Sequence, residues 1–512
     1  MKNWHIIAAA MAVTSAGSAL LAPSFSLLPA LLALAGVVCA NCVFLAGRFG
    51  EALERPVEWR WLAVCAGVGL SLAVLGGEGH LFFSKDDWLG RDAVLADLVS
   101  RAMPAFYRHE GGDFILRAPL GMYLLPAAVG RIAGLQAAHF TLVGQTTFLL
   151  AAFFYAITLV WPRGRLAFIF LFVFFSGLDS IPVLIKTGGA SLLRVPAFWV
   201  EIGYFPPNLS QVFWCPPHAL PGWWFAALAV LYLRREIDLA ALSAASLPLL
   251  LWSPLALMGA AAIFVPLALL SPQEITRPRF AFACMSALGF LPLLAYLGAG
   301  ADGVPHRLQI FESGFADEYV LLLIFGLTQL AFVFVFWKRL DVWFRPLLAI
   351  SALLLLISPL FNLGYMNDAT QRVSIAPRAL LAFGFDALLI DFFFARAWAP
   401  LAAGALVFLI GAMSPALELY DTLTTPRFSI SDCNLLTVYR KHNHDRYLPT
   451  YIAAIDSFPS WLFAGGPKSA PLEVETRLCW PDRVYGEKLF NWLKPEYRIW
   501  LREPRPEDLS AK

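Results

Sequence analysis

The sequence predicts an all-α membrane protein that crosses the bilayer many times, and composition is the first reason. Hydrophobic residues make up 59% of the 512 residues and charged residues only 14%, whereas about a quarter of a soluble domain is charged. This composition excludes an ordinary cytosolic enzyme, a disordered chain and a small disulfide-framework protein. The near balance of 38 basic and 36 acidic residues also argues against nucleic acid as a partner, which would need a basic patch.

The second reason is a series of apolar runs, which predicts about 13 transmembrane helices. A helix needs roughly 20 mostly apolar residues to span the hydrocarbon core. No repeat at a solenoid-like period is visible. The candidate runs are residues 4–22, 26–47, 60–76, 118–134, 138–161, 166–185, 217–233, 237–252, 253–271, 281–299, 319–337, 346–363, 376–394 and 398–416.

The basic residues between these runs predict sidedness, because short cytoplasmic loops collect Lys and Arg. By this rule, residues 118–161 lead from an outer segment to an inner turn, which needs an odd number of crossings, but they contain two apolar runs. One of these two runs is therefore re-entrant or interfacial, or the basic pair that follows them is misplaced. The first run is interpreted as an uncleaved helix rather than a signal peptide. The segments expected on the outer side are 77–117, 186–216, 300–317, 364–375 and the tail from residue 417.

The tail differs in composition, with many charged residues, prolines and tryptophans. We expect residues 1–416 to form the transmembrane domain and residues 417–512 a small mixed extramembrane domain, too short for a large core of its own. Cys433 and Cys479 both fall in this tail. In an oxidising compartment they could form a disulfide, although their spacing alone leaves the pairing open.

The first outer segment, 77–117, carries two adjacent acids, Asp86 and Asp87, directly before Trp88. Adjacent carboxylates repel each other, so that one tends to keep its proton or both are held by a cation. Such a pair suits a general base or a metal ligand. Apolar residues then recur at helical spacing, with Asp92 and Asp97 off the apolar stripe, which predicts an amphipathic helix in the membrane interface. The alternative is an acidic turn with Trp88 as an interfacial anchor.

The stretch 194–218, at the end of the second outer segment and the re-entry into the membrane, combines aromatic residues, prolines and hydrogen-bonding groups, among them Glu201 and His218. Aromatic faces with a few polar groups suit a sugar ring or a flat head group. The alternative is an aromatic belt with rigid turns, in which His218 is a structural residue.

The outer segment 364–375 contains Asp368 and Arg372, four residues apart. On a helix these two side chains share a face and can form an ion pair. The planar guanidinium of Arg372 is also well suited to a phosphate group. The segment therefore predicts either a phosphate-binding arginine or a structural ion pair between two helix ends.

Several motifs are absent from the sequence: a Walker loop, a G-x-G-x-x-G turn after a strand, H-E-x-x-H and G-x-S-x-G. Nucleotide-driven transport, dinucleotide chemistry and the corresponding hydrolases lose support.

Three stretches taken together resemble the polytopic GT-C glycosyltransferases of bacteria. They are Asp86-Asp87-Trp88 with the helix that follows, Phe213 to Trp223 around His218, and Tyr365 to Ser374 around Arg372. The resemblance covers roughly residues 60–400. It implies a GT-C-like bundle in a bacterial inner membrane, with the active site and the C-terminus in the periplasm. In this family the acidic motif follows the first span, whereas here about three spans precede it.

The resemblance also implies a mechanism. GT-C enzymes transfer a sugar, a hexose or pentose, with inversion from a polyprenyl-phosphate donor to an acceptor hydroxyl on a glycan or lipid. Asp87 would be the general base, with Asp86 as helper; both would hold a divalent cation, Mg²⁺ or Mn²⁺, if one is bound. Arg372, paired with Asp368, would stabilise the departing phosphate. The remaining expected substrate contacts, made at the surface of the membrane lipids, are His218, Glu201 and Trp88.

Two other functions compete with this interpretation. A lipid or solute transporter or flippase is expected to show paired broken helices near the midplane, but the sequence has one evident break, near Gly177. A polymerase or ligase of lipid-linked glycans would call for several outer-loop arginines rather than an acidic pair.

Overall fold

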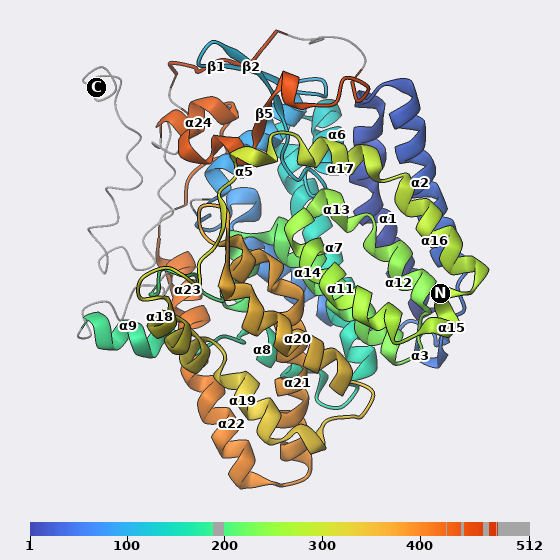
Figure 1. Cartoon of the computed structure of the whole chain (residues 1–512), viewed down its shortest axis with the longest axis vertical. Coiled ribbons are helices and arrows are strands. Elements are labelled where there is room, and N and C mark those ends of the chain that lie inside the picture. The colour runs from blue at the N-terminus through green and yellow to red at the C-terminus, as the bar shows by residue number, and fades with distance from the viewer. Residues whose placement is uncertain are drawn as a thin grey trace.

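The structure, a computed structural model, is mostly helical (Figure 1). Asp86 lies outside the residues that it describes, and so do the last three tryptophans of the tail. The described residues are 1–85, 87–187, 199–425, 427–441, 445–463, 470–477 and 479.

In the first part of the chain, α1 and α2 pack together and α16 packs on α2 (Figure 1). Its elements are α1 (Asn3–Leu21), α2 (Leu27–Leu45), α3 (Glu51–Glu54), α4 (Trp59–Leu75), a 3-10 turn (Glu78–His80), α5 (Asp87–Ser100), β1 (Phe106–His109), β2 (Gly112–Leu116), α6 (Leu124–Ala133), α7 (Leu135–Val160), α8 (Arg165–Val173), α9 (Ser180–Thr187), α10 (Asn208–Trp214), α11 (Pro216–Leu233), α12 (Leu239–Ser246), α13 (Leu249–Trp252), α14 (Pro254–Leu269), α15 (Pro272–Ile275), α16 (Pro278–Leu288) and α17 (Leu291–Gly298).

In the second part of the chain, α21 packs on α19 and α20 and also on α8 and α11 from the first part. Its elements are β3 (His306–Leu308), α18 (Phe315–Leu321), α19 (Thr328–Val335), α20 (Arg345–Ile357), β4 (Phe361–Leu363), a π-helical turn (Ala369–Val373), α21 (Ile375–Phe394), α22 (Trp398–Gly411), α23 (Met413–Thr424), α24 (Leu435–Lys441) and β5 (Ile452–Ala454).

The prediction of about 13 spans is wrong for the described residues. Length and apolar composition qualify four helical stretches as membrane spans, and six if two bent pairs each count as one. The bends measure 40° between α16 and α17, and 59° before α19. Hydropathy alone misses such breaks: the run 166–185 divides into α8 and α9, and 237–252 into α12 and α13. The four stretches are Asn3–Ser24, Leu27–Leu45, Leu135–Val160 and Trp398–Thr424.

These long apolar helices indicate a membrane protein. Leu27 and Leu28 of α2, for example, are 76% and 67% exposed, and large exposed apolar surfaces mark contact with lipid or a partner. The short α6 bears on the extra run in 118–161: ten residues extend only about 15 Å, half the thickness of the hydrocarbon core. This length favours α6 as the run that does not cross.

A three-stranded sheet covers one end of the bundle (Figure 1). Strands β1 and β2 form an antiparallel hairpin whose turn residues, Glu110 and Gly111, both have positive φ, as a tight two-residue hairpin turn requires. Strand β5, from the tail, pairs antiparallel with β2. The tail therefore completes a sheet that the first outer segment begins.

A second, two-stranded sheet joins the predicted outer segment 300–317 to the end of the predicted apolar run 346–363. Strand β3 pairs antiparallel with β4, and His306 lies opposite Leu363. The side-chain amide of Gln309 donates a 3.0 Å hydrogen bond to the carbonyl oxygen of Ile202, and the amide of Asn367 donates to the same oxygen. The segments around 202, 308 and 365 therefore meet at one end of the protein.

Helix α5 forms where the sequence predicts it, but it does not lie exposed in an interface. It packs between α6 and α24, and Asp92 and Asp97 are buried. The expectation that these acids face outward is wrong because the tail covers the polar face. The Oδ2 atom of Asp97 accepts hydrogen bonds from the Tyr107 hydroxyl at 2.7 Å and from the Leu435 backbone N–H at 3.1 Å.

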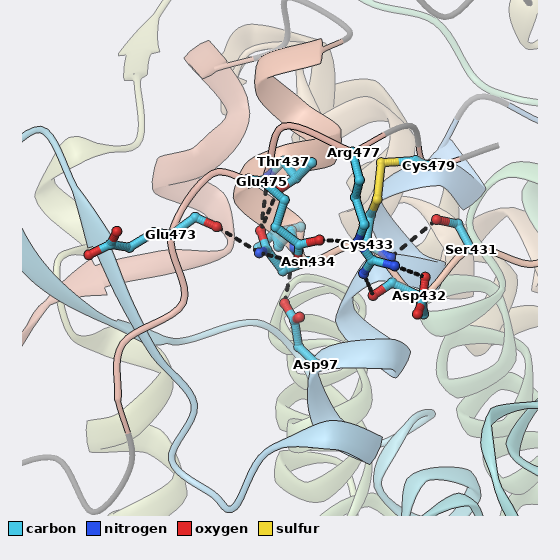
Figure 2. The surroundings of a disulfide bond; sticks show 11 residues. Asp97, Ser431, Asp432, Cys433, Asn434, Thr437, Glu473, Glu475, Arg477 and Cys479 are labelled. Atoms are coloured by element: carbon cyan, nitrogen blue, oxygen red, sulfur yellow. Dashed lines mark hydrogen bonds and ion pairs between the residues drawn. A yellow bond between two sulfur atoms is a disulfide. The ribbon is translucent and has the colours of Figure 1, made fainter. Parts of the chain in front are cut away.

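The disulfide between Cys433 and Cys479, left open by the sequence, is present, with a Cα–Cα distance of 5.5 Å. Figure 2 shows it beside the contact between Asp97 and the start of α24. Next to Cys433, the side-chain amide of Asn434 donates a 2.8 Å hydrogen bond to the Glu473 carbonyl oxygen. The described part of the tail thus packs on the segment 77–117 and forms one unit with it, and the expected boundary at 417 falls within α23.

Candidate functional site

Asp87 opens helix α5, where a negative charge interacts favourably with the positive end of the helix dipole. Its side chain is 40% exposed, and its Oδ2 atom lies 2.9 Å from Arg91, one turn later. The Arg91 side chain is 5% exposed. The arginine therefore fixes one carboxylate oxygen from inside the protein, while the acid keeps access to the outside.

Trp88 is a core residue rather than an interfacial anchor. Its side chain is 1% exposed, and its indole N–H donates a 3.0 Å hydrogen bond to the Phe213 carbonyl oxygen. The Arg91 guanidinium lies over its ring, 5.5 Å from the centroid. The Trp88 ring thus packs against the Arg91 guanidinium. Because Trp88 is buried, it has no exposed surface for the substrate contact that the sequence interpretation assigned to it.

Lys85 anchors the chain just before the acidic motif. Its ammonium group is buried and lies 2.7 Å from both Glu418 and Asp421 of α23. Burial opposes the charge on Lys85, but the two carboxylates outweigh this and raise its pKa. Glu418 is also hydrogen-bonded to the indole N–H of Trp214 at 2.9 Å. The segment before Asp87 is therefore held by a buried ion network that spacing in the sequence does not reveal.

Asp368 and Arg372 form the predicted ion pair, at 2.9 Å, on the π-helical turn. The Arg372 side chain remains 26% exposed. Helix α14 approaches this turn very closely, because an added Cβ at Gly259 would lie 1.9 Å from the Val373 carbonyl oxygen. Gly259 therefore allows the backbone contact that supports the turn carrying Arg372.

The two ion pairs, from opposite halves of the chain, lie within electrostatic reach of each other. Burial raises the pKa of Asp368, Arg372 opposes this, and the charge of Asp87 adds to it. Burial disfavours the charged form of Arg372, but Asp368 and Asp87 more than compensate and raise its pKa. The predicted acid and the predicted phosphate-binding arginine therefore influence each other's charge across the fold.

His218 belongs to the same neighbourhood. It lies in the first turn of α11, and its Nδ1 atom is 2.6 Å from the Ser253 hydroxyl oxygen. The charges of Arg372 and Arg91 both act on it. The bond to Ser253, which caps α14, orients the ring.

Glu201 stands apart from these residues. It is exposed, and its backbone N–H donates a 2.8 Å hydrogen bond to the Glu318 carboxylate. Within the described parts of the chain, no hydrogen bond or ion pair joins the Glu201 side chain to Arg372. The possible cation site at Asp86 and Asp87 includes Asp86, which lies outside the residues that the structure describes.

Sequence reasoning missed two contributors. Arg91 could have been found, because it follows Asp87 at the four-residue spacing of a helical ion pair. Tyr451 could not: its position next to β5 brings it within electrostatic reach of Arg91 and Arg372 only after the tail has docked.

A partly open apolar groove of about 420 Å³ adjoins the turn that carries Arg372. Ala369 and Val373 of that turn line it together with residues of α14, α20 and α21 and of the β3–β4 sheet, including His306 and Arg307. The same π-helical turn therefore carries the basic Arg372 and part of the apolar lining of the groove.

Comparison with known proteins gives no relative: no family model, no curated protein and no solved structure matches the chain. The chemical interpretation therefore depends on the geometry. A partly exposed carboxylate near a partly exposed guanidinium can take a proton from a hydroxyl and can bind a phosphate group.

Proposed function

We propose that the chain is a membrane glycosyltransferase that transfers a sugar from a polyprenyl-phosphate donor to an acceptor hydroxyl. One observation carries the proposal: Asp87 and Arg372, from the predicted outer segments 77–117 and 364–375, are both partly exposed and lie within electrostatic reach of each other. The chain's long apolar helices suit a lipid-borne donor.

In this reaction Asp87 is the general base. It takes the proton of the acceptor hydroxyl while that oxygen forms a bond to the anomeric carbon of the sugar. The bond from that carbon to the phosphate oxygen breaks, and the phosphate leaves with the electron pair. Attack opposite the leaving group inverts the anomeric centre. Arg91 fixes the Oδ2 atom of Asp87 at 2.9 Å, which orients the carboxylate for this role.

Arg372 binds the phosphate, on which negative charge develops as the bond to the sugar breaks. Its 2.9 Å contact with Asp368 restrains the guanidinium, and its exposed part is available to the donor. His218, within reach of the charge of Arg372, is placed to contact the phosphate or sugar. Any cation at Asp87, Mg²⁺ or Mn²⁺, would add positive charge on the same side.

The apolar groove beside Arg372 suits the first isoprene units of the donor. Its lining is predominantly apolar, and Ala369 and Val373 belong to the same turn as Arg372. A lipid chain in this groove would place its phosphate next to the turn. The Cys433–Cys479 disulfide supports an oxidising compartment for this end of the protein, such as a bacterial periplasm.

The test is release of polyprenyl phosphate from a panel of synthetic polyprenyl-phosphate hexoses and pentoses, with envelope lipids and glycans as acceptors. Asp87→Asn should lower release at least about a hundredfold, the contribution of a general base. The matched control is Asp113→Asn, because Asp113 is 44% exposed and paired with Arg108 in the same outer segment. Wild-type activity in Asp87→Asn would remove this residue from the mechanism.

A further inference from the structure

Three potential metal ligands lie close together near the segment that carries Asp87, and none of them takes part in the proposed transferase site. They are His80 of the 3-10 turn, Asp92 of α5 and His139 of α7, and one nitrogen or oxygen atom of each lies within 4.8 Å of the others. All three are at least nine-tenths buried. Because these groups are buried, each of their polar atoms needs a partner inside the protein.

The hydrogen bonding of His80 leaves one nitrogen directed at the cluster. Its Nδ1 atom lies 3.0 Å from the Phe428 carbonyl oxygen, and a carbonyl can only accept, so Nδ1 carries the hydrogen. The Nε2 atom is then free to bind through its lone pair. This is the arrangement in which a metal-ligating histidine is usually oriented by its other nitrogen.

The contacts within the cluster are close but are not aligned hydrogen bonds. His80 Nε2 lies 2.7 Å from Asp92 Oδ2, yet neither atom makes a hydrogen bond of acceptable angle. Both ring nitrogens of His139 are buried and also lack a hydrogen-bond partner. An ion pair between His80 and Asp92 alone would leave His139 unsatisfied, and a buried polar group without a partner destabilises the fold.

We propose that His80, Asp92 and His139 bind a divalent transition-metal ion of the Zn²⁺ type. Two imidazole nitrogens and one carboxylate oxygen are a ligand set that Zn²⁺ takes in proteins, with a fourth position left open. Water can fill that position.

The ion would fix the segment that carries Asp87. His80 and Asp92 lie on either side of the acidic motif, and His139 belongs to the long helix α7. A shared ion therefore ties the 3-10 turn and α5 to the bundle. This role does not depend on the proposed transferase activity.

The experiment is metal analysis of the full-length, tag-free protein in detergent after gel filtration over a weak chelator. We expect about one Zn²⁺ per chain, and Co²⁺ exchanged into the site should give visible ligand-field bands. His139→Asn should weaken metal binding at least about tenfold. The matched control is His306→Asn, because His306 lies exposed on β3, and it should keep the metal.

Each outcome decides the proposal. Loss of the metal in His139→Asn with retention in His306→Asn, at unchanged gel-filtration position, supports it. Wild-type protein that holds no Zn²⁺ and shows no Co²⁺ bands overturns the proposal. This outcome is measured on the wild type alone, so it does not depend on whether a variant folds. Equal metal content in His139→Asn and wild type overturns it as well. Transferase activity enters neither reading.

Discussion

Replacing Asp97 with asparagine should flatten the pH dependence of thermal stability. Burial raises the pKa of Asp97 to about 7, while the hydrogen bonds from Tyr107 and from the Leu435 backbone lower it, the charge of Glu475 raises it and that of Arg101 lowers it. In the unfolded chain this carboxyl has its usual pKa near 3.8. Between these two values the folded state binds the proton more tightly than the unfolded state.

The sign of the effect follows from this difference. The stabilisation from Asp97 is fully present below pH 3.8 and is lost as the pH rises to about 7. The full loss amounts to about 4 kcal/mol. Asparagine keeps an oxygen that can accept from Tyr107 and Leu435 but carries no charge. Asp97→Asn should therefore already exceed the wild type in stability at pH 5, and its advantage should grow by about 2–3 kcal/mol between pH 5 and pH 8.

The assay is thermal unfolding in detergent from pH 5 to pH 8, followed by tryptophan fluorescence. Histidines titrate in the same range in both proteins, so the quantity of interest is the difference between their Tm values at each pH. The control is Asp113→Asn, whose side chain is exposed and should leave the pH profile unchanged. Parallel profiles for Asp97→Asn and wild type would refute the reasoning.

Two further predictions concern packing around the site. Lys85→Met should destabilise the fold by about 3–5 kcal/mol, because it removes the cation that pairs with the buried Glu418 and the partly buried Asp421. An unfolding midpoint within error of wild type would contradict the ion network. Gly259→Ala should lower Tm and weaken donor binding, because the added methyl group would overlap a carbonyl oxygen of the π-helical turn. Gly67→Ala is the control and should do neither, because the space around Gly67 is open. Equal effects of the two changes would refute this prediction.

Much of the helical layout could be predicted, because apolar runs report directly on helices. The runs 4–22, 26–47 and 138–161 match α1, α2 and α7 closely. The spacing of Asp368 and Arg372 also gave their ion pair, since four residues separate neighbours on one helix face. Local patterns of this kind require no knowledge of the rest of the fold.

Features that depend on contacts between residues far apart in the chain could not be predicted from the sequence. Trp88 follows two acids and so resembles an interfacial anchor, but Phe213 supplies a buried acceptor for its indole N–H. Asp97 falls on the polar side of α5, and only the docked tail buries it. The number of spans was overestimated because hydropathy averages over the kinks that shorten a helix, such as the one before α19.

The central claim, that Arg372 binds the phosphate of a polyprenyl lipid, is tested most directly by binding of polyprenyl phosphate to the purified protein. Arg372→Gln should weaken this binding at least about tenfold, the effect of losing a charged hydrogen bond. The control is Arg339→Gln, because Arg339 is exposed in the turn after α19. Wild-type affinity in Arg372→Gln, at an unchanged gel-filtration position, would contradict the account.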